Sequence, residues 1–138
     1  MGYKAILFGS IGTLIETSEL QRRAFNQAFA EAGLDWDWNT EEYRRLLTKS
    51  GGCERIQDFA TRRGSEVNAE QLHQQKTIIF DRLMANETIL LRPGAANIIR
   101  YALDNRLRLG FVTTTSEANI DAVFFAVANQ LNRSDFNF

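Results

Sequence analysis

The stretch Ala5-Ile6-Leu7-Phe8-Gly9-Ser10-Ile11-Gly12-Thr13-Leu14 decides how this chain folds. Residues 5–8 are all apolar, and they run directly into a segment that contains Gly9 and Gly12. A short apolar run that stops at glycine is typical of a buried strand that ends in a loop. We therefore expect a strand at 5–8 and a glycine-containing loop at its carboxyl end.

Helical patterns fill the chain after this loop. Apolar residues recur every four positions from Leu20 to Ala32, and Gly33 provides a stop because glycine accepts the left-handed conformation after a last turn. Further helices are expected from residue 39 or 40 to 49, from 54 to 63, and from 68 onward. This part of the chain is therefore predicted to be a helical block.

The pattern changes after Pro93-Gly94, which predicts a turn. An amphipathic helix is expected at 95–105, a second short strand at 107–112, an apolar helix at 117–129, and the start of a third strand at 135–138. The order strand, helical block, helix, strand, helix indicates an α/β fold with a helical insertion after its first strand.

Composition excludes several classes of protein. The 138-residue chain has a formal net charge of -1 and interspersed charges, so no basic patch favours nucleic acid. The longest apolar run, 122–128, is too short to span a bilayer. Cys53 is the single cysteine, which suits a reducing compartment. We expect a cytoplasmic protein without nucleic-acid or membrane partners.

Several segments resemble one known family. Residues 5–14 look like a strand followed by the DxDGTL signature of the haloacid dehalogenase (HAD)-like hydrolase superfamily. Residues 91–94 resemble the entry to its next core helix, and 111–114 resemble its second signature, a strand that ends in Thr or Ser. Residues 19–26 and 51–56 are similar to the CbbY-like and β-phosphoglucomutase-like branch, which acts on sugar phosphates.

The resemblance implies a fold and a division into domains. We expect a Rossmann-like α/β core with a parallel sheet of about three strands, in line with the order of the elements. Residues 1–15 and 88–138 would form this partial core, and 16–87 would form an α-helical cap inserted after the first strand.

The catalytic carboxylates of the family are replaced in this sequence. In the family, the first Asp of DxDGTL attacks phosphorus and the second acts as general acid and base. Gly9 stands at the first position and Ile11 at the second. Glycine has no side chain to attack with, and isoleucine has no proton to exchange. We therefore expect no intact catalytic residues and a catalytically inactive homologue.

The cofactor expectation follows from the same resemblance. The family uses Mg²⁺, held partly by a late acidic pair, together with a Lys that steadies the phosphate. By comparison with the family these signatures would lie beyond Phe138. With Gly9 and Ile11 also uncharged, we expect the Mg²⁺ site not to be preserved and the chain to hold no metal or other cofactor.

A phosphate site could persist without the chemistry. Gly12, Thr13, Thr113 and Thr114 follow the two predicted strands, where backbone N–H groups and hydroxyls can meet a ligand phosphate. The alternative is that these threonines only cap the next helix, a task that Ser116 could share.

The predicted cap offers two further candidates. Arg22 and Arg55 match positions that face sugar phosphates in the resembled branch, where His would be expected at Gln21 and Lys at Cys53. Because Gln21 and Cys53 depart from that pattern, a solvated helix face is the preferred interpretation of both arginines. Outside the site, we expect His73 to be exposed on its helix.

Three functions remain open. The first is a pseudoenzyme that retains weak binding of phosphate or a sugar phosphate. The second is a sugar-phosphate phosphatase, completed by a further C-terminal half or a second chain. The third is a structural or interaction protein, or a relic. Because later strands of the family's sheet are not expected here, residues 3–8 should present an open hydrogen-bonding edge, covered most simply by pairing in a homodimer.

Overall fold

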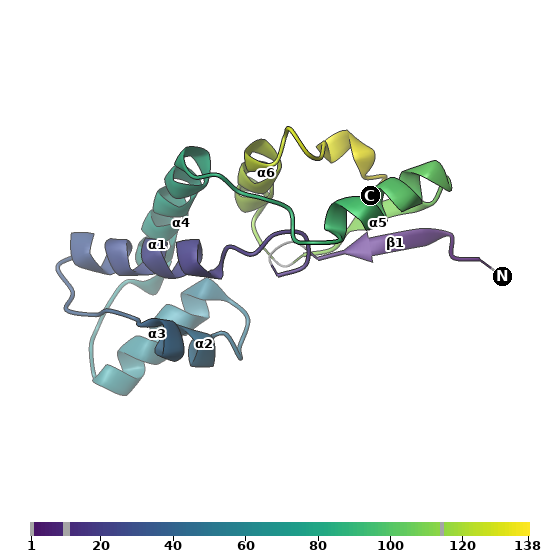
Figure 1. Cartoon of the computed structure of the whole chain (residues 1–138). Helices are drawn as coiled ribbons and strands as arrows, with labels where there is room; N and C mark the ends of the chain where they lie inside the picture. The colour runs from purple at the N-terminus through teal and green to yellow at the C-terminus, as the bar shows by residue number, and fades with distance from the viewer. Residues whose placement is uncertain (1, 10–11, 114) are drawn as a thin grey trace. The chain divides into compact units, whose positions relative to one another are not determined.

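The structure is a computed structural model that describes residues 2–9, 12–113 and 115–138. Ile11 and Thr114 therefore lie outside the described residues. The elements follow one another as in Figure 1: β1 (Ala5–Phe8), α1 (Ser18–Glu31), α2 (Thr40–Leu46), α3 (Gly52–Arg63), α4 (Ala69–Asn86), α5 (Ala95–Asp104), β2 (Arg108–Phe111), α6 (Glu117–Ala126) and the 3₁₀ turn η1 (Arg133–Asp135).

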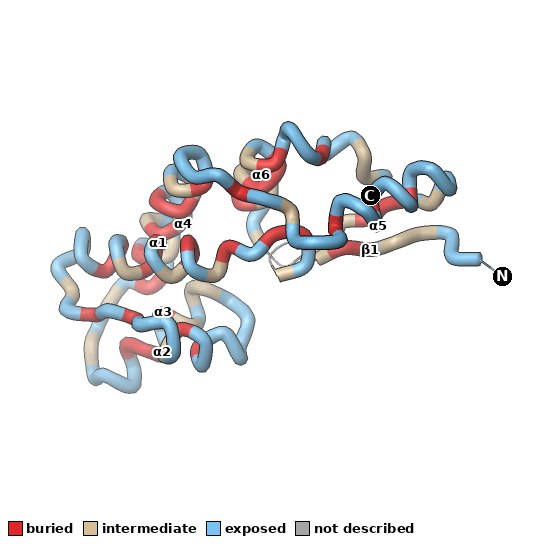
Figure 2. Tube along the Cα trace, in the orientation of Figure 1, coloured by how far each residue is buried: buried red, intermediate tan, exposed pale blue. Residues whose placement is uncertain are grey.

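The chain forms two compact units. The first, here called the core unit, consists of Met1–Ser18 and Met84–Phe138, and the second, the helical unit, of Glu19–Leu83. Each has its own buried residues, whose positions are coloured red along the trace in Figure 2. That residues 16–87 act as a cap over the site of the core stays a prediction.

The sheet of the core unit is parallel, as expected for an α/β fold. β1 pairs with β2, with Ala5 opposite Arg108 and Phe8 opposite Phe111. Within the described residues the sheet has two strands. The expected third strand is reduced to backbone hydrogen bonds from Asn137 N to Leu109 O (2.7 Å) and from Phe111 N to Phe138 O (2.7 Å). η1 occupies the residues just before this segment, which shortens it.

An aromatic cluster packs on one face of this sheet. The ring of Phe111 lies 5.4 Å from that of Phe124 on α6 and 5.5 Å from that of Phe136, measured between centroids. Phe136 also meets Phe8 at 6.2 Å, nearly perpendicular. Such edge-to-face pairs add to the stabilisation from burial. The cluster ties both strands to α6 and to the C-terminal segment.

The helical unit is built around the loop that joins α1 to α2. Trp36 and Trp38 of this loop are buried, and Trp38 packs against Phe25 and Phe29 of α1 at 4.9 and 4.8 Å between centroids. Phe59 of α3 lies 5.3 Å from Trp38. The buried indoles therefore connect the helices through the loop.

Helix ends follow the sequence signals. α3 ends at Gly64 in the left-handed conformation (φ 65°), and the Asn39 and Asn68 side chains accept the N–H of Glu42 (2.9 Å) and Gln71 (3.0 Å) at the starts of α2 and α4. No helix in the described part of the chain is long and apolar enough to cross a membrane.

Candidate phosphate-binding site

The carboxyl ends of β1 and β2 lie side by side, which brings the loops that follow them together. Val112 N donates to Phe8 O at 2.8 Å, one residue beyond the strand pairing. Gly9 and Thr113 come next on the two strands. In open parallel sheets ligands bind at the carboxyl ends of the strands, so this edge is the candidate site.

Residues 12–15, which follow β1, form a tight turn. Gly12 has φ of 87°, a conformation that favours glycine, and its N–H donates to Ile15 O at 2.6 Å. The guanidinium of Arg92 donates to Gly12 O, and Arg92 N donates to Leu14 O at 2.7 Å. The Gly12 N–H is thus used inside the turn, whereas the side chain of Thr13 is exposed.

Gly9, at the end of β1, lies next to Thr13 and Val112. A Cβ placed there would lie 3.1 Å from Thr13 Oγ1 and 3.9 Å from Val112 O. The structure therefore brings Gly9, Thr13 and the β2 loop to one place. A Cβ at position 9 would require Thr13 Oγ1 to move by a few tenths of an ångström.

The loop after β2 is organised by hydroxyls. Thr113 Oγ1 accepts the N–H of Thr115 at 3.1 Å, and Ser116 Oγ accepts the N–H of Asn119 at 3.2 Å. Asn119 Nδ2 donates to Thr115 Oγ1 at 2.9 Å. Ser116 caps α6, as the alternative interpretation predicted, while Thr113 stays next to the end of β1. The placement of Thr114 lies outside the described residues.

The donor set does not fit a Mg²⁺ ion. Across residues 2–9, 12–113 and 115–138, no group of three or more His, Cys, Asp or Glu side chains is arranged to hold a metal. Mg²⁺ prefers carboxylates and other oxygen ligands in octahedral geometry. The ends of β1 and β2 offer Gly9, Thr13 and Thr113 instead. These described residues supply no carboxylate ligand for Mg²⁺.

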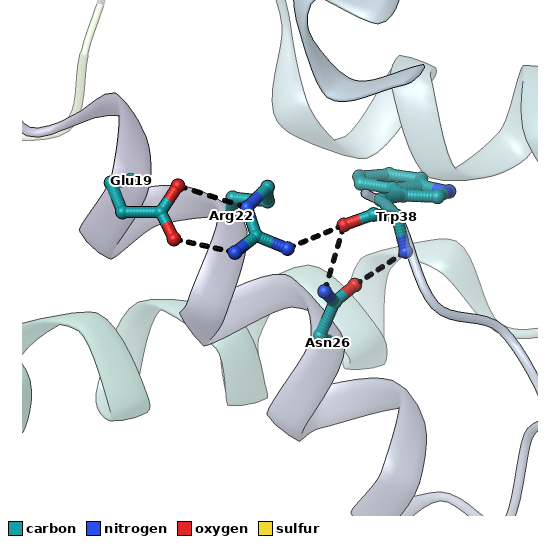
Figure 3. Close-up of polar contacts among 4 residues, drawn as sticks. All are labelled: Glu19, Arg22, Asn26 and Trp38. Atoms are coloured by element: carbon teal, nitrogen blue, oxygen red, sulfur yellow. Dashed lines mark hydrogen bonds and ion pairs between the residues drawn. The ribbon is translucent and has the colours of Figure 1, made fainter. Parts of the chain in front are cut away.

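Arg22 of α1 is held inside the helical unit (Figure 3). Its Nη1 donates to Trp38 O at 2.8 Å, and its Nε donates to Glu19 Oε2 at 3.0 Å. The hydrogen bond from Arg22 holds the pKa of Glu19 below its ordinary value. The guanidinium thus stabilises the buried loop. We had expected Arg22 to lie on a solvated helix face without such a role.

Arg55 of α3 is also tied to backbone. Its Nε donates to Leu46 O at 3.1 Å and its Nη2 to Lys49 O at 2.9 Å. The guanidinium carbon lies 5.9 Å from the centroid of Phe25 and 5.8 Å from that of Tyr43. Arg55 therefore fixes the turn between α2 and α3. Arg22 and Arg55 belong to the helical unit, whereas Gly12, Thr13 and Thr113 belong to the core unit.

Lys76 is a notable residue that the sequence did not single out. Only 3% of it is exposed, and its Nζ lies 4.9 Å from the centroid of Phe25 and 5.0 Å from that of Phe80. Burial, with a smaller effect from the charge of Arg55, lowers the pKa of Lys76 to about 8. Lys76 lies on the same helix face as Ile79 and Phe80, three and four residues further along, and this spacing could have indicated its burial.

The prediction for His73 was wrong. The side chain is half-buried against Phe25, 6.5 Å between ring centroids, and close to Gly52. Burial, followed by the charge of Lys76, lowers the pKa of His73. The absence of a side chain at Gly52 makes this packing possible. Burial also raises the pKa of the Cys53 thiol, which disfavours its nucleophilic thiolate form.

Comparisons with known proteins agree with this architecture. The haloacid dehalogenase-like hydrolase family matches residues 3–136. Protein CbbY of Cereibacter sphaeroides is 47% identical over 123 residues, which is 87% of this chain and 54% of that protein. The chain thus spans about half the length of the curated relatives it matches.

Solved structures give the same result. CbbY from Rhodobacter sphaeroides, as a mutant in complex with xylulose-1,5-bisphosphate and in complex with phosphate, superposes with a TM-score of 0.88 at 44% identity. Each alignment covers 99% of this chain and 62% of the CbbY chain. The chain belongs to the haloacid dehalogenase-like hydrolases and is related to CbbY.

Proposed function

We propose that this chain belongs to a sugar-phosphate phosphatase and supplies part of its phosphate-binding site. The observation that carries the proposal is the close similarity to CbbY, whose structures hold phosphate and xylulose-1,5-bisphosphate. The reaction would hydrolyse a phosphate ester, with water consumed and a sugar hydroxyl and inorganic phosphate released. Groups that this chain lacks would come from a further polypeptide segment.

The phosphate would bind at the ends of β1 and β2. Thr13 and Thr113 lie on the two loops that meet there, and the exposed hydroxyl of Thr13 can donate to a phosphate oxygen. Thr114 completes the proposed set by sequence, while Gly12 contributes the turn that holds Thr13 in place. Arg22 and Arg55 hold backbone carbonyls inside the helical unit and are not part of this proposed phosphate site.

A second function is favoured by Gly9, which gives this site no carboxylate nucleophile. In that case the protein binds a sugar phosphate without releasing phosphate. Binding and turnover can be separated by two measurements on the full chain. Isothermal titration with xylulose-1,5-bisphosphate and with inorganic phosphate measures affinity, and a colorimetric assay with Mg²⁺ measures phosphate release.

The outcomes are distinct. Phosphate release over many turnovers supports the phosphatase. Saturable binding without release supports the second function. Absence of both binding and release contradicts the proposal, provided that circular dichroism and a cooperative melt show the chain to be folded.

Substitution of Gly9 locates the bound phosphate. Gly9→Asp adds a negative charge at the end of β1, so repulsion should weaken phosphate affinity about tenfold or more. Gly9→Ala introduces the same crowding of Thr13 Oγ1 without charge and is the matched control, expected to bind nearly as the natural chain does. Equal effects of both substitutions would place the phosphate elsewhere.

A further inference from the structure

The segment that joins α3 to α4 in the helical unit carries two hollows on its surface. The first has a volume of about 530 Å³ and is lined by residues of α1 and α4. The second has a volume of about 770 Å³ and is lined by residues of α3 and α4. Glu66, Val67 and Asn68 line both hollows, so the two are here called together the 66–68 groove.

The charged residues that line the 66–68 groove are all acidic. Among the described residues that line the two hollows there is no Lys, Arg or His. Their glutamates are Glu31, Glu54, Glu66 and Glu70. The chain as a whole is nearly balanced, with 16 Lys and Arg against 17 Asp and Glu. The groove therefore concentrates negative charge in a way that the overall composition does not require.

Glu31 is held in place in its ionised form. Its Oε1 accepts a hydrogen bond from Gln27 Nε2 at 3.0 Å, and its Oε2 accepts one from Gln75 Nε2 at 2.8 Å. The hydrogen bond from Gln27 and then that from Gln75 lower the pKa of Glu31, and the charge of Arg82 adds a smaller effect. Each carboxylate oxygen can accept a further hydrogen bond, so this fixed carboxylate can still receive a cationic donor.

The second hollow is electronegative as well. The thiol of Cys53 lines it, and the charges of Glu54 and Glu70 add to the effect of burial in raising the pKa of this thiol. Negative charges that oppose an anion at this place favour a cation there. Both hollows therefore suit the same kind of occupant.

Apolar side chains line the first hollow beside the glutamates. Ala28 and Leu72 are buried, and Leu34 and Val67 are half-buried against the aromatic core of the helical unit. Apolar surface next to carboxylates suits a side chain that has a long aliphatic stem and a cationic end, as Lys and Arg do.

We propose that the 66–68 groove docks a basic segment of another protein. The aliphatic stems of its Lys or Arg side chains lie along Leu34 and Val67, and their cationic ends pair with the four glutamates. Because the two hollows share residues 66–68, an extended segment with several cationic side chains can occupy both, which a single small amine cannot. Charge complementarity of this kind sets the choice of partner and the rate of association. The proposal does not rest on the proposed function.

The test uses a defined basic peptide, acetyl-Lys-Leu-Lys-Leu-Lys-amide, titrated into the isotopically labelled full chain. We expect saturable changes of amide chemical shift by NMR, concentrated at residues 28–34, 53–57 and 66–72. The same peptide with Glu in place of Lys should not bind. Spermidine, a polyamine without a peptide backbone, should bind at least about tenfold more weakly, which corresponds to about 1.4 kcal/mol.

Glu66→Lys should weaken binding of the basic peptide about tenfold or more, because it places a like charge in both hollows. Glu41→Lys changes the net charge equally at an exposed residue of α2 outside the groove, and it should leave affinity nearly unchanged. The shift map of the unmodified chain does not depend on the folding of either variant. The proposal would be overturned by shifts spread over other acidic surfaces, by equal losses in both variants, by equal affinity for spermidine, or by the absence of saturable binding.

Discussion

The side-chain amide of Asn26 holds the backbone of Trp38 through both of its groups. Nδ2 donates to the carbonyl oxygen of Trp38 at 2.9 Å, and Oδ1 accepts its N–H at 2.8 Å, so the side chain takes the place of a strand partner (Figure 3). Trp38 itself is fully buried. The pair fixes the loop between α1 and α2 from the middle of α1.

Asn26→Ala should therefore destabilise the helical unit. The Trp38 N–H loses its partner in a largely buried place, which costs about 1–3 kcal/mol of unfolding free energy. Urea denaturation followed by far-ultraviolet circular dichroism measures the change. Gln27→Ala, which removes an exposed hydrogen bond to Glu31 from the next residue, is the control and should cost much less. Equal losses would contradict the role given to Asn26.

Arg55→Lys should loosen the turn between α2 and α3. A lysine ammonium cannot reproduce the planar fork that reaches Leu46 O and Lys49 O together, so stability should fall by about 1 kcal/mol. Amide exchange at residues 47–51 should speed up in the same variant. Arg62→Lys on α3, where the guanidinium has one long contact to Asp58 O, serves as the comparison. Unchanged exchange at 47–51 would refute the prediction.

Lys76 should make stability depend on pH in the alkaline range. Its folded pKa of about 8 lies below its ordinary value of 10.5, so between these values the unfolded chain binds more protons. The contribution of Lys76 to unfolding free energy is therefore least favourable below pH 8 and improves as pH rises through the window. Lys76→Met should stabilise the protein at pH 7, by about 3 kcal/mol at most, since the uncharged side chain has no desolvation cost.

Chemical denaturation at pH 7, 8, 9 and 10 measures this effect. The stability difference between Lys76→Met and the natural chain should shrink with rising pH. Lys49→Met, which changes an exposed lysine paired with Asp58, is the control and should show no such trend. A difference that stays constant from pH 7 to 10 would mean that the Lys76 charge is not suppressed by folding.

Gly52→Ala should release His73 from its packing. The added Cβ would lie 2.5 Å from Nε2 and 2.7 Å from Cδ2 of the imidazole, so the ring must move toward water. The lowered pKa of His73 should then rise toward its ordinary value, because burial is the main cause of the shift. Titration of the His73 ring protons by NMR measures it directly. Gly2→Ala, with no atom near its Cβ, should leave the titration unchanged.

Local signals allowed much of the fold to be predicted. The first strand and the ends of most helices follow from glycines, asparagine caps and apolar periodicity, which act within a few residues. The apolar repeat from Leu20 did not give the first residue of α1, which is Ser18, where the backbone N–H donates to Glu16 Oε1 at 2.7 Å.

The candidate site was less predictable, because contacts between distant residues decide it. The residues near Arg22 in the sequence do not indicate that its guanidinium donates to the carbonyl of Trp38. Likewise, the residues near His73 do not indicate that its ring packs in the space left by Gly52. Lys76 follows two glutamines and looks polar, although the rings of Phe25 and Phe80 enclose its ammonium. The residues at the ends of β1 and β2 could be predicted from the sequence, because the order of the strands alone brings them together.

The two tryptophans of the chain, Trp36 and Trp38, both lie in the helical unit. Tryptophan fluorescence therefore reports on the helical unit and not on the core unit. Recorded beside a probe of total helix content, it separates the melting of the two units within a single sample, without any label. Two coincident curves would show that the units unfold as one cooperative body, and two separated curves would show that each has its own stability.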